Sequence, residues 1–319
     1  MKAIVVENFG GPEVMKLLEK PTPAPERGQV LVAVKAAGVN PVDTYIRAGG
    51  YGLRSMPFTP GLDGAGTVEA VGAGVSSVKP GDRVYLDGSL TGTYATHALC
   101  ESTQVHPLPA ALSFAQGAGI CVPYLTAARA LFQKALGKKG EWLLVHGGSG
   151  GVGTATIQLA KAAGLNVIAT AGTNKGRELC KKEGALHVLD HEAPEYLNAI
   201  PKLTGGKGVD VILEMLANIN LGKDLTVLNK NGRVVVIGSR GAVEVNPRDA
   251  MVKDAVILGM TLFNCPPEDR AALHDLLAKG FADKSLRPVV GKEFSLAEAG
   301  KAHEAVMAPG AFGKIVLLP

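Results

Sequence analysis

The sequence has few cysteines, and they do not cluster. Cys100, Cys121, Cys180 and Cys265 are spread along 319 residues with no C-x-x-C pair among them. This spacing argues against a disulfide framework and against a cysteine-rich zinc site. It is typical of proteins of a reducing compartment, so we expect a cytoplasmic protein.

Long apolar runs and dense basic runs are also lacking. No apolar run reaches the roughly 18 residues that a membrane span requires, so we expect no membrane association. The first apolar run is broken by Glu7 and Asn8 and is too short for a signal peptide. The net charge of +4 comes without a block of Lys and Arg, which gives no nucleic-acid signature. The ordinary globular composition and the length together predict two domains.

A glycine-rich segment is the strongest local signal. Gly147–Gly153 reads GGSGGVG, follows the apolar run Trp142–Val145, and opens a helical pattern that extends to Ala163. From Gly148 onward it fits G-x-G-x-x-G in the strand-to-helix context of a dinucleotide-binding fingerprint. Glycine permits the sharp turn, the approach of a pyrophosphate to the backbone, and close packing of the helix on the strand. The helix N-terminus offers free N–H groups to phosphates.

The rhythm of predicted elements changes near residue 123. Residues 1–122 consist mostly of short strands separated by Gly and Pro turns, with one helix that begins at Pro41 and is capped by Asn40; this pattern predicts a small β-barrel or sandwich. Strands and helices then alternate, which predicts a doubly wound parallel sheet. The tail is mixed and can complete the first domain. We expect strands over 166–171, 187–189, 209–215, 233–237 and 255–261, and helices over 124–135, 175–182, 195–203 and 223–229.

The end of the second strand of such a sheet distinguishes the two nicotinamide cofactors. An acidic residue there binds the ribose 2′-hydroxyl, whereas basic residues accept a 2′-phosphate. The strand 166–171 is followed by no Asp or Glu, but by Thr173, Lys175 and Arg177, which can donate to a phosphate. Cations in the first turn of a helix oppose its dipole, which favours a bound anion over a merely solvated surface. We therefore expect NADPH.

Several motifs together make the chain similar to a known family. They are Gly140–Gly153 with Gln158 and Lys161, Gly38–Arg47, Glu214–Asn218 and Gly238–Gly241. Across its whole length the chain resembles the medium-chain dehydrogenase/reductases, and among them the zeta-crystallin type of quinone oxidoreductase. The resemblance implies an α/β protein with a GroES-like β-barrel catalytic domain formed by residues 1–122 and 264–319. It implies an inserted Rossmann doubly wound domain at 123–263, NADPH as cofactor, and a homo-oligomer, usually a tetramer.

The resemblance also implies a set of cofactor contacts. Tyr45 is expected beside the nicotinamide, the pyrophosphate on the glycine-rich loop, and Gly172 at the adenosine ribose. His191 and Asn220 are expected to flank the adenosine, and the segment after the fifth strand to line the cofactor. We add Lys175 and Phe263 to this set. The full list is Tyr45, Ser149, Gly150, Gly151, Val152, Gly172, Lys175, His191, Asn220, Ile237, Gly238, Ser239, Arg240 and Phe263.

The chain departs from the zinc-dependent branch of this superfamily. Zinc alcohol dehydrogenases carry a cysteine at the position of Asn40 and a His-Glu pair at those of Leu62 and Asp63. Catalytic zinc needs three N, S or O protein ligands, which this set does not supply, so we expect no metal. The other histidines show no metal spacing and are left without a role: His97, His106, His146, His187, His274 and His303.

Without a Lewis acid, a simple ketone is hard to polarise, whereas a quinone accepts reducing equivalents readily from the cofactor. We expect reduction of small quinones, with Tyr45 and Asn40 orienting and polarising the substrate carbonyl. One alternative is an NADPH-dependent reductase of 2-alkenals or enones. Another is a structural crystallin role or binding of AU-rich RNA that retains the NADPH site. A fold does not fix its chemistry, so these alternatives stay open.

Overall fold

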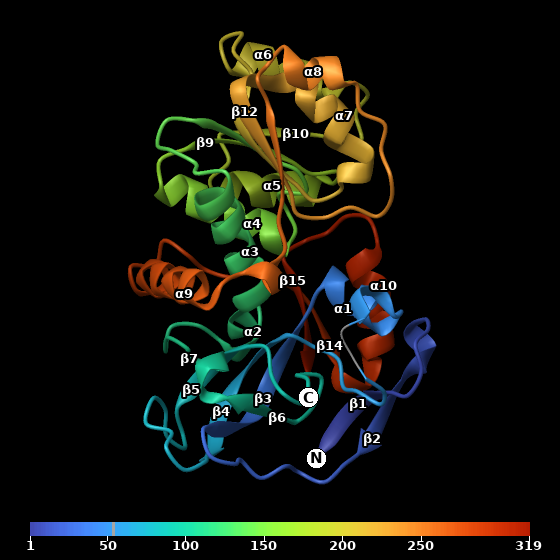
Figure 1. Cartoon of the computed structure of the whole chain (residues 1–319), viewed down its shortest axis with the longest axis vertical. Helices are drawn as coiled ribbons and strands as arrows, with labels where there is room; N and C mark the ends of the chain where they lie inside the picture. Colours follow the sequence, from blue (N-terminus) through green and yellow to red (C-terminus); the bar gives the residue numbers. More distant parts are fainter. Residues whose placement is uncertain (53–54) are drawn as a thin grey trace. The chain divides into compact units, whose positions relative to one another are not determined.

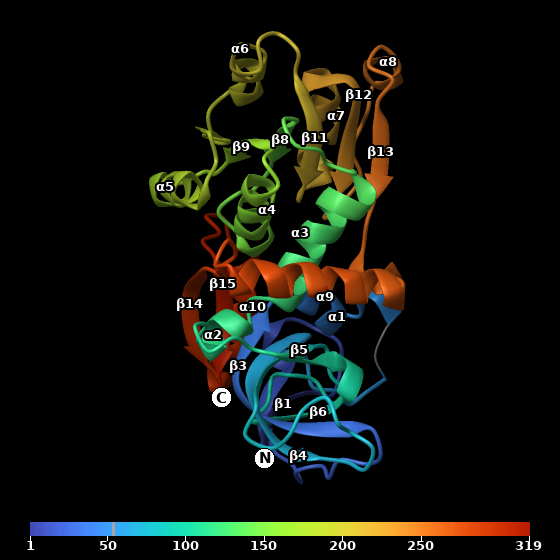
Figure 2. The ribbon, with the colours of Figure 1, turned by 90° about the vertical axis from the view of Figure 1, so that its left-hand side faces the viewer.

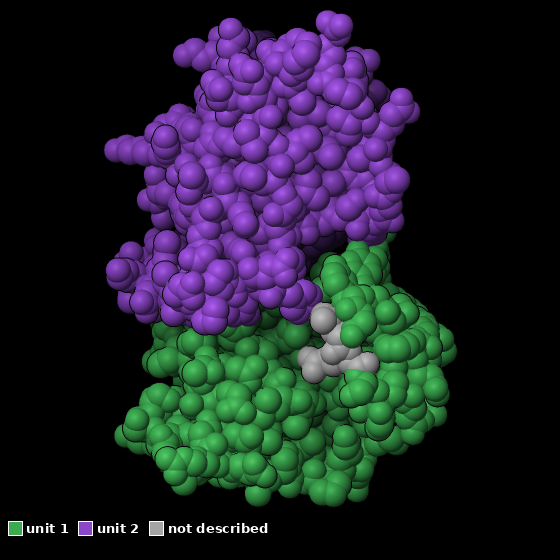
Figure 3. Space-filling view, in the orientation of Figure 1, with its two compact units in different colours: residues 1–122, 288–309, 313–319 green, residues 123–287, 310–312 purple. Residues whose placement is uncertain are grey.

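The computed structural model describes residues 1–52 and 55–319, and the chain divides into two compact units (Figures 1 and 3). Unit 1 consists of residues 1–122, 288–309 and 313–319. Unit 2 consists of residues 123–287 and 310–312. No helix of the described residues is long and apolar enough to cross a membrane.

Unit 2 is built on a six-stranded sheet in the order β10-β9-β8-β11-β12-β13, in which all neighbouring strands are parallel. Its two central strands, β8 and β11, are mostly apolar and mostly buried, as expected for a sheet that is covered on both faces. This confirms the predicted doubly wound sheet. The strands are β8 (Trp142–Val145), β9 (Asn166–Thr170), β10 (His187–Leu189), β11 (Val209–Glu214), β12 (Leu228–Val236) and β13 (Val256–Gly259).

The helices of unit 2 pack on both faces of this sheet (Figure 2). Helix α4 packs on β8 and β9, and α7 packs on β11 and β12. The helices are α3 (Thr126–Ala128), α4 (Gly151–Ala162), α5 (Asn174–Glu183), α6 (Ile200–Leu203), α7 (Ala217–Val227), α8 (Pro247–Met251) and α9 (Pro267–Ala282). Wider helical turns flank α3 at Cys121–Leu125 and Arg129–Lys134, and short 3₁₀ turns lie at Tyr196–Ala199 and Leu262–Asn264.

Two predicted helices differ from the structure. Helix α7 begins at Ala217, not at 223, and the last residues of the predicted helix already belong to β12. Two asparagines and a glycine in its first turns have low helix propensity, so the sequence pattern did not indicate a helix there. The predicted helix over 195–203 is a 3₁₀ turn followed by the short α6, with Pro201 in the first turn of α6.

Unit 1 is built on a mixed sheet in the order β14-β15-β3-β4-β5-β7, with β6 paired to the long strand β3. Strand β15 pairs antiparallel with β3, so the tail of the chain does complete the first unit. The strands are β1 (Lys2–Val6), β2 (Met15–Glu19), β3 (Gln29–Val39), β4 (Asp63–Val71), β5 (Arg83–Asp87), β6 (His97–Glu101), β7 (Val105–Pro107), β14 (Val290–Ser295) and β15 (Lys314–Leu318). The helices are α1 (Pro41–Arg47), α2 (Phe114–Gly117) and α10 (Ala299–Met307), with 3₁₀ turns at Pro12–Val14, Gly50–Gly52, Ser102–Gln104 and Leu296–Glu298.

The second boundary between the units lies later than the expected break at 264. The chain divides between Arg287 and Pro288, so that α9 belongs to unit 2. Its apolar face explains this placement. Leu273, Leu277 and Phe281 are buried, and the Phe281 ring meets the Tyr124 ring edge-on at 5.4 Å.

Candidate functional site

The glycine-rich loop of unit 2 leads into a set of backbone N–H donors in the first turn of α4. Gly150 is the N-cap of α4, and the first helical hydrogen bond runs from Thr154 N to Gly150 O at 2.9 Å. The amides of Gly151, Val152 and Gly153 precede that bond, so they have no acceptor within the helix. Together with the helix dipole they form a site suited to a pyrophosphate.

Glycine is required in this loop by close contact between its two ends. A Cβ atom on Gly153 would lie 2.2 Å from Gly147 O and 2.6 Å from Gly148 Cα. Helix α4 therefore packs against the loop at a distance that only glycine permits, as the fingerprint predicts. The Ser149 hydroxyl donates to Ala311 O at 2.7 Å, which fixes the middle of the loop.

The three residues after β9 that were expected to donate to a 2′-phosphate, Thr173, Lys175 and Arg177, make different contacts in the structure. Thr173 caps α5 by accepting from Gly176 N at 3.0 Å. The Arg177 guanidinium forms an ion pair with Asp190 at 2.7 Å and also donates to the side chain of Asn174. Lys175 is exposed, with its ammonium 4.3 Å from the centre of the Phe312 ring. Of the two cations, Lys175 is therefore the one that is not engaged by a carboxylate.

A pocket of about 350 Å³ opens beside the end of β10, a volume within the range of small-molecule sites. His191 lies on its wall, and its Nδ1 is 3.2 Å from Thr170 Oγ1. Burial lowers the pKa of His191, so this ring is neutral at physiological pH. The lining residues are His191, Ala193, Pro194, Glu195, Tyr196, Leu197, Asn198, Lys223 and Thr226.

Hydrogen bonds join the segment after β11 to the segment after β12. The carbonyl of Glu214 accepts from Ile237 N at 2.9 Å, and Gly238 O accepts from Ala217 N at 2.9 Å. Arg240 N donates to the Asn218 side chain at 2.9 Å. The Ser239 hydroxyl donates to Gly241 O at 3.0 Å.

The unit 2 residues expected to bind cofactor thus follow the carboxyl ends of successive parallel strands, which is where ligands bind in open α/β sheets. Ser149 to Val152 follow β8, and Gly172 and Lys175 follow β9. His191 follows β10, Asn220 follows β11, Ile237 to Arg240 follow β12, and Phe263 follows β13.

Three buried polar side chains lie behind the loop, and the sequence did not point to them. His146, Glu214 and Asp224 are each at most 3% exposed. His146 Nε2 is 2.8 Å from Asp224 Oδ1 and 3.4 Å from Glu214 Oε2. Asp224 lies on the buried face of α7 beside Leu225, and this position is the one signal in the sequence that could have revealed it.

In unit 1, α1 carries the two residues expected at the substrate. Asn40 caps the helix, and its backbone N–H donates to Asp43 Oδ2 at 2.8 Å, as predicted from the Asn-Pro pair. Tyr45 is half-buried, and among the described residues its hydroxyl has no hydrogen-bond partner. Asp43 and Thr44 are buried within the first turn of the helix.

A buried lysine occupies the region of the positions that hold zinc in the zinc-dependent branch. The Lys314 ammonium donates to Asp63 Oδ2 at 2.5 Å and to Asn40 Oδ1. Asn40 Nδ2 donates to the same Asp63 oxygen at 3.0 Å, and Asp63 Oδ1 accepts from Val122 N at 2.7 Å. The oxygens of Asn40 and Asp63 are thus already bound to a protein cation, and this set does not fit a zinc ion.

A second hydrogen-bonded chain runs from Asp43 into the core of unit 1. The Tyr94 hydroxyl donates to Asp43 Oδ2 at 3.2 Å, and Tyr94 Oη lies 3.1 Å from His303 Nε2. His303 Nδ1 is 3.0 Å from the Arg47 guanidinium. Burial and the Arg47 charge lower the pKa of His303 to about 3, while burial raises the pKa of Asp43 to about 7. His303 is therefore a neutral structural residue.

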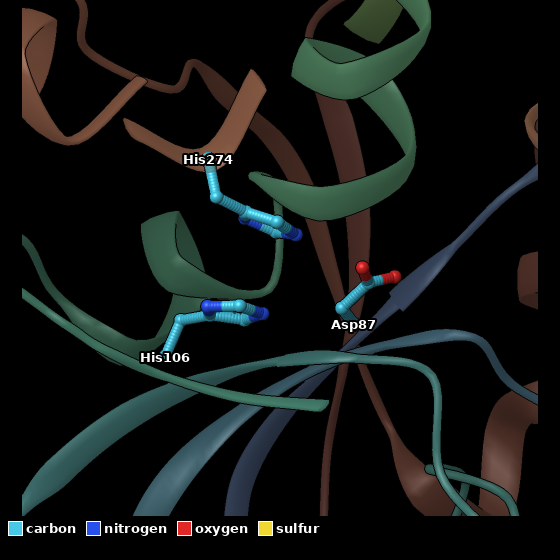
Figure 4. A group of neighbouring side chains, drawn as sticks. All are labelled: Asp87, His106 and His274. Carbon is cyan, nitrogen blue, oxygen red and sulfur yellow. The ribbon is translucent and has the colours of Figure 1, made fainter. Parts of the chain in front are cut away.

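Asp87 and His106 come from neighbouring strands of the unit 1 sheet (Figure 4). The Cys121 thiol donates to Asp87 Oδ1 at 3.0 Å, and the His106 ring stacks on Tyr85 with centroids 5.2 Å apart. Figure 4 also labels His274, which belongs to α9 of unit 2.

Comparisons with known proteins agree with this architecture. The alcohol dehydrogenase GroES-like domain matches residues 26–110, and the zinc-binding dehydrogenase family matches residues 151–279. Quinone oxidoreductases of rat and pig are 48% and 49% identical over the whole chain, which spans 98% of each. A quinone oxidoreductase of Escherichia coli, solved in complex with NADPH, is 30% identical with a TM-score of 0.89 over both complete chains.

A GroES-like unit with a six-stranded Rossmann unit inserted in it, and with a glycine-rich loop after the first strand of that sheet, defines a medium-chain dehydrogenase/reductase. Within that superfamily, the chain belongs to the quinone oxidoreductase family.

Proposed function

We propose that this protein is an NADPH-dependent quinone reductase that works without zinc. The observation that carries the proposal is the bond from Lys314 to Asn40 and Asp63, which occupies the zinc positions of the alcohol dehydrogenase branch. A reductase without a Lewis acid requires a substrate that accepts reducing equivalents readily, and quinones meet this requirement. Full-length relatives named quinone oxidoreductase support the same substrate class.

The residues of unit 2 fit a nicotinamide dinucleotide. The free amides of Gly151 to Gly153 would hold the pyrophosphate, and the pocket beside His191 would take the adenine. The absence of an acidic residue in the stretch after β9, together with the exposed Lys175, favours a 2′-phosphate and hence NADPH. When bound, NADPH supplies a hydride to the substrate.

Tyr45 and Asn40 would orient and polarise the quinone carbonyl. The Tyr45 hydroxyl is not used in any hydrogen bond among the described residues, so it can donate to the oxygen that gains charge. Asn40 has one amide N–H left, because the other binds Asp63 and its carbonyl oxygen binds Lys314. Tyr45 is therefore the stronger donor candidate of the two.

The test is the loss of NADPH absorbance on addition of an ortho-quinone, run beside an NADH reaction and a 2-alkenal reaction. We expect rapid oxidation of NADPH by the quinone, and no comparable rate with NADH or with the 2-alkenal. Turnover of the alkenal without the quinone would move the assignment to an alkenal reductase. NADPH binding without turnover of either would contradict a reductase and favour the structural or RNA-binding alternative.

We further propose a homo-oligomer, with a tetramer as the expected size, in the cytoplasm. Strand β13 is the edge of the parallel sheet, and Val256 and Ile257 on it are each 45% exposed. An exposed apolar edge of this kind is normally covered, and a second copy of the same edge would extend the sheet. None of the four cysteines forms a disulfide, in keeping with a reducing compartment.

A further inference from the structure

The cluster of His146, Glu214 and Asp224 behind the glycine-rich loop has too little positive charge to neutralise two ionised carboxylates. Glu214 and Asp224 are both fully buried, and the imidazole of His146 is the group that faces them. Burial lowers the pKa of His146, and it raises the pKa of Glu214 to about 7. Two ionised carboxylates beside a neutral imidazole would bury two charges without a counter-ion, which is strongly unfavourable.

The hydrogen bonds of the cluster show where a proton is missing. Glu214 Oε1 accepts from Leu216 N and, at 3.2 Å, from Asn220 Nδ2. Asp224 Oδ1 accepts from His146 Nε2 at 2.8 Å. Glu214 Oε2 and Asp224 Oδ2 are the two buried oxygens of this cluster that lack a donor among the described residues. One proton between these oxygens would satisfy both.

We propose that Glu214 and Asp224 share one proton, with the Glu214 carboxyl donating to the Asp224 carboxylate, and that this pair positions the cofactor-binding segments. The second carboxylate oxygen of Asp224 then accepts from His146 Nε2–H, and His146 Nδ1 faces the Tyr196 hydroxyl at 3.5 Å. The pair takes no part in hydride transfer. Glu214, Asp224 and His146 are positioning residues.

Glu214 and His146 are each joined to a segment expected to hold the cofactor, so the inference rests on the proposed function. Glu214 fixes the side chain of Asn220 and, through its carbonyl, the backbone of Ile237. His146 directly precedes the glycine-rich loop. Tyr196, which faces His146, lies on the wall of the pocket beside His191. Loss of the shared proton would therefore affect both the segments that hold the adenosine and the loop that holds the pyrophosphate of the cofactor.

The inference predicts weaker cofactor binding at high pH. The titratable groups that face the pair are His146, which directly follows β8, Tyr196 on the 3₁₀ turn and, beyond His146, His191. His146 and His191 are neutral throughout the alkaline range, and burial raises the pKa of Tyr196 well above it. Loss of the shared proton would then leave two facing carboxylates, and their repulsion would pull Glu214 from Asn220.

The decisive experiment measures the Kd of NADPH by fluorescence between pH 7 and 9.5 for wild type and Glu214→Gln. The glutamine amide replaces the shared proton with one that does not titrate and keeps the acceptor for Asn220. We expect wild-type binding to weaken about tenfold over this range, as one unit of a linked pKa would give. Glu214→Gln should bind as wild type does at pH 7 and stay constant. The surface variant Glu178→Gln should keep the wild-type profile.

Several outcomes would overturn the inference. The first is that Glu214→Gln retains the wild-type pH dependence, and the second is that it binds NADPH poorly at every pH. The third is that the wild type contains one equivalent of divalent metal per chain and that Glu214→Gln loses this metal. If wild type binds no NADPH at all, the proposed function fails, and thermal unfolding then tests the shared proton alone. Because the folded pKa of Glu214 is raised, its stabilising contribution is complete below about pH 4.5 and is lost as the pH rises through 7. Wild type should therefore lose more stability than Glu214→Gln between pH 5 and 8.

Discussion

At the scale of single residues, the Tyr45 hydroxyl is a donor on α1 that has no hydrogen-bond partner among the described residues. We expect Tyr45→Phe to lower kcat about threefold to tenfold, the value of one neutral hydrogen bond, and to leave the Kd of NADPH unchanged. Stopped-flow oxidation of NADPH by a quinone, with NADPH binding measured separately, checks this. Complete loss of turnover with intact binding would show an essential acid in place of an orienting group.

Lys175 is the residue that should set the preference for NADPH over NADH. Arg177, the other cation of this segment, is bound to Asp190, whereas Lys175 is exposed at the first turn of α5. We expect Lys175→Glu to raise the KM for NADPH about tenfold or more, the value of a charge-assisted hydrogen bond, with little change for NADH.

The matched control for this change is Lys182→Glu, which alters the charge by the same amount in the last turn of the same helix. It should leave both KM values near those of the wild type. An equal loss of affinity for NADPH and NADH in Lys175→Glu would show a general field effect and contradict the assignment of a 2′-phosphate contact.

At the scale of elements, local patterns predicted most strands and the glycine-rich loop well. Strands β8 and β10 have the predicted bounds, because each is a short apolar or β-branched run between turn residues. Helix α7 was placed too late, because its first two turns contain residues of low helix propensity that tertiary packing overrides.

The polar clusters escaped prediction for a different reason. His146 and Asp224 are 78 residues apart, and Lys314 and Asp63 are 251 apart. Their contacts depend on which strands become neighbours in a sheet, and no local pattern encodes that order. The family resemblance named Asn40 and the positions of Leu62 and Asp63, but it did not reveal the lysine that binds the Asn40 and Asp63 side chains.

The loop and helix α4 form one element whose close packing can be tested by adding a single carbon atom. In Gly153→Ala the new Cβ would meet backbone atoms at 2.2 Å, so helix and loop must move apart. We expect a clear fall in Tm, equivalent to about 1–3 kcal/mol of overpacking, together with loss of NADPH binding. Gly150→Ala is the control for stability, since its Cβ would have no neighbour closer than 3.5 Å, and its Tm should stay near the wild-type value.

At the scale of the whole molecule, the chain is one continuous polypeptide whose tail returns to the first unit, and the position of that return was the hardest boundary to predict. Residues 264–287 contain α9 (Pro267–Ala282), and the packing of its apolar face on residues such as Tyr124 places it in the second unit. The expectation of a GroES-like fold interrupted by a Rossmann fold is confirmed.

The edge strand β13 should carry the contact between copies of the chain. Val256 and Ile257 expose apolar surface along an unpaired edge, and a charged side chain on a strand edge disfavours pairing with another strand. We expect Ile257→Lys to reduce the sedimentation mass of the oligomer to a smaller species at micromolar concentration, with the fold retained by circular dichroism. Leu136→Lys places the same charge on an exposed leucine elsewhere in unit 2 and should keep the wild-type mass. If Ile257→Lys also keeps that mass, the β13 edge is not the interface, and a wild-type protein that sediments as a monomer would contradict the homo-oligomer itself.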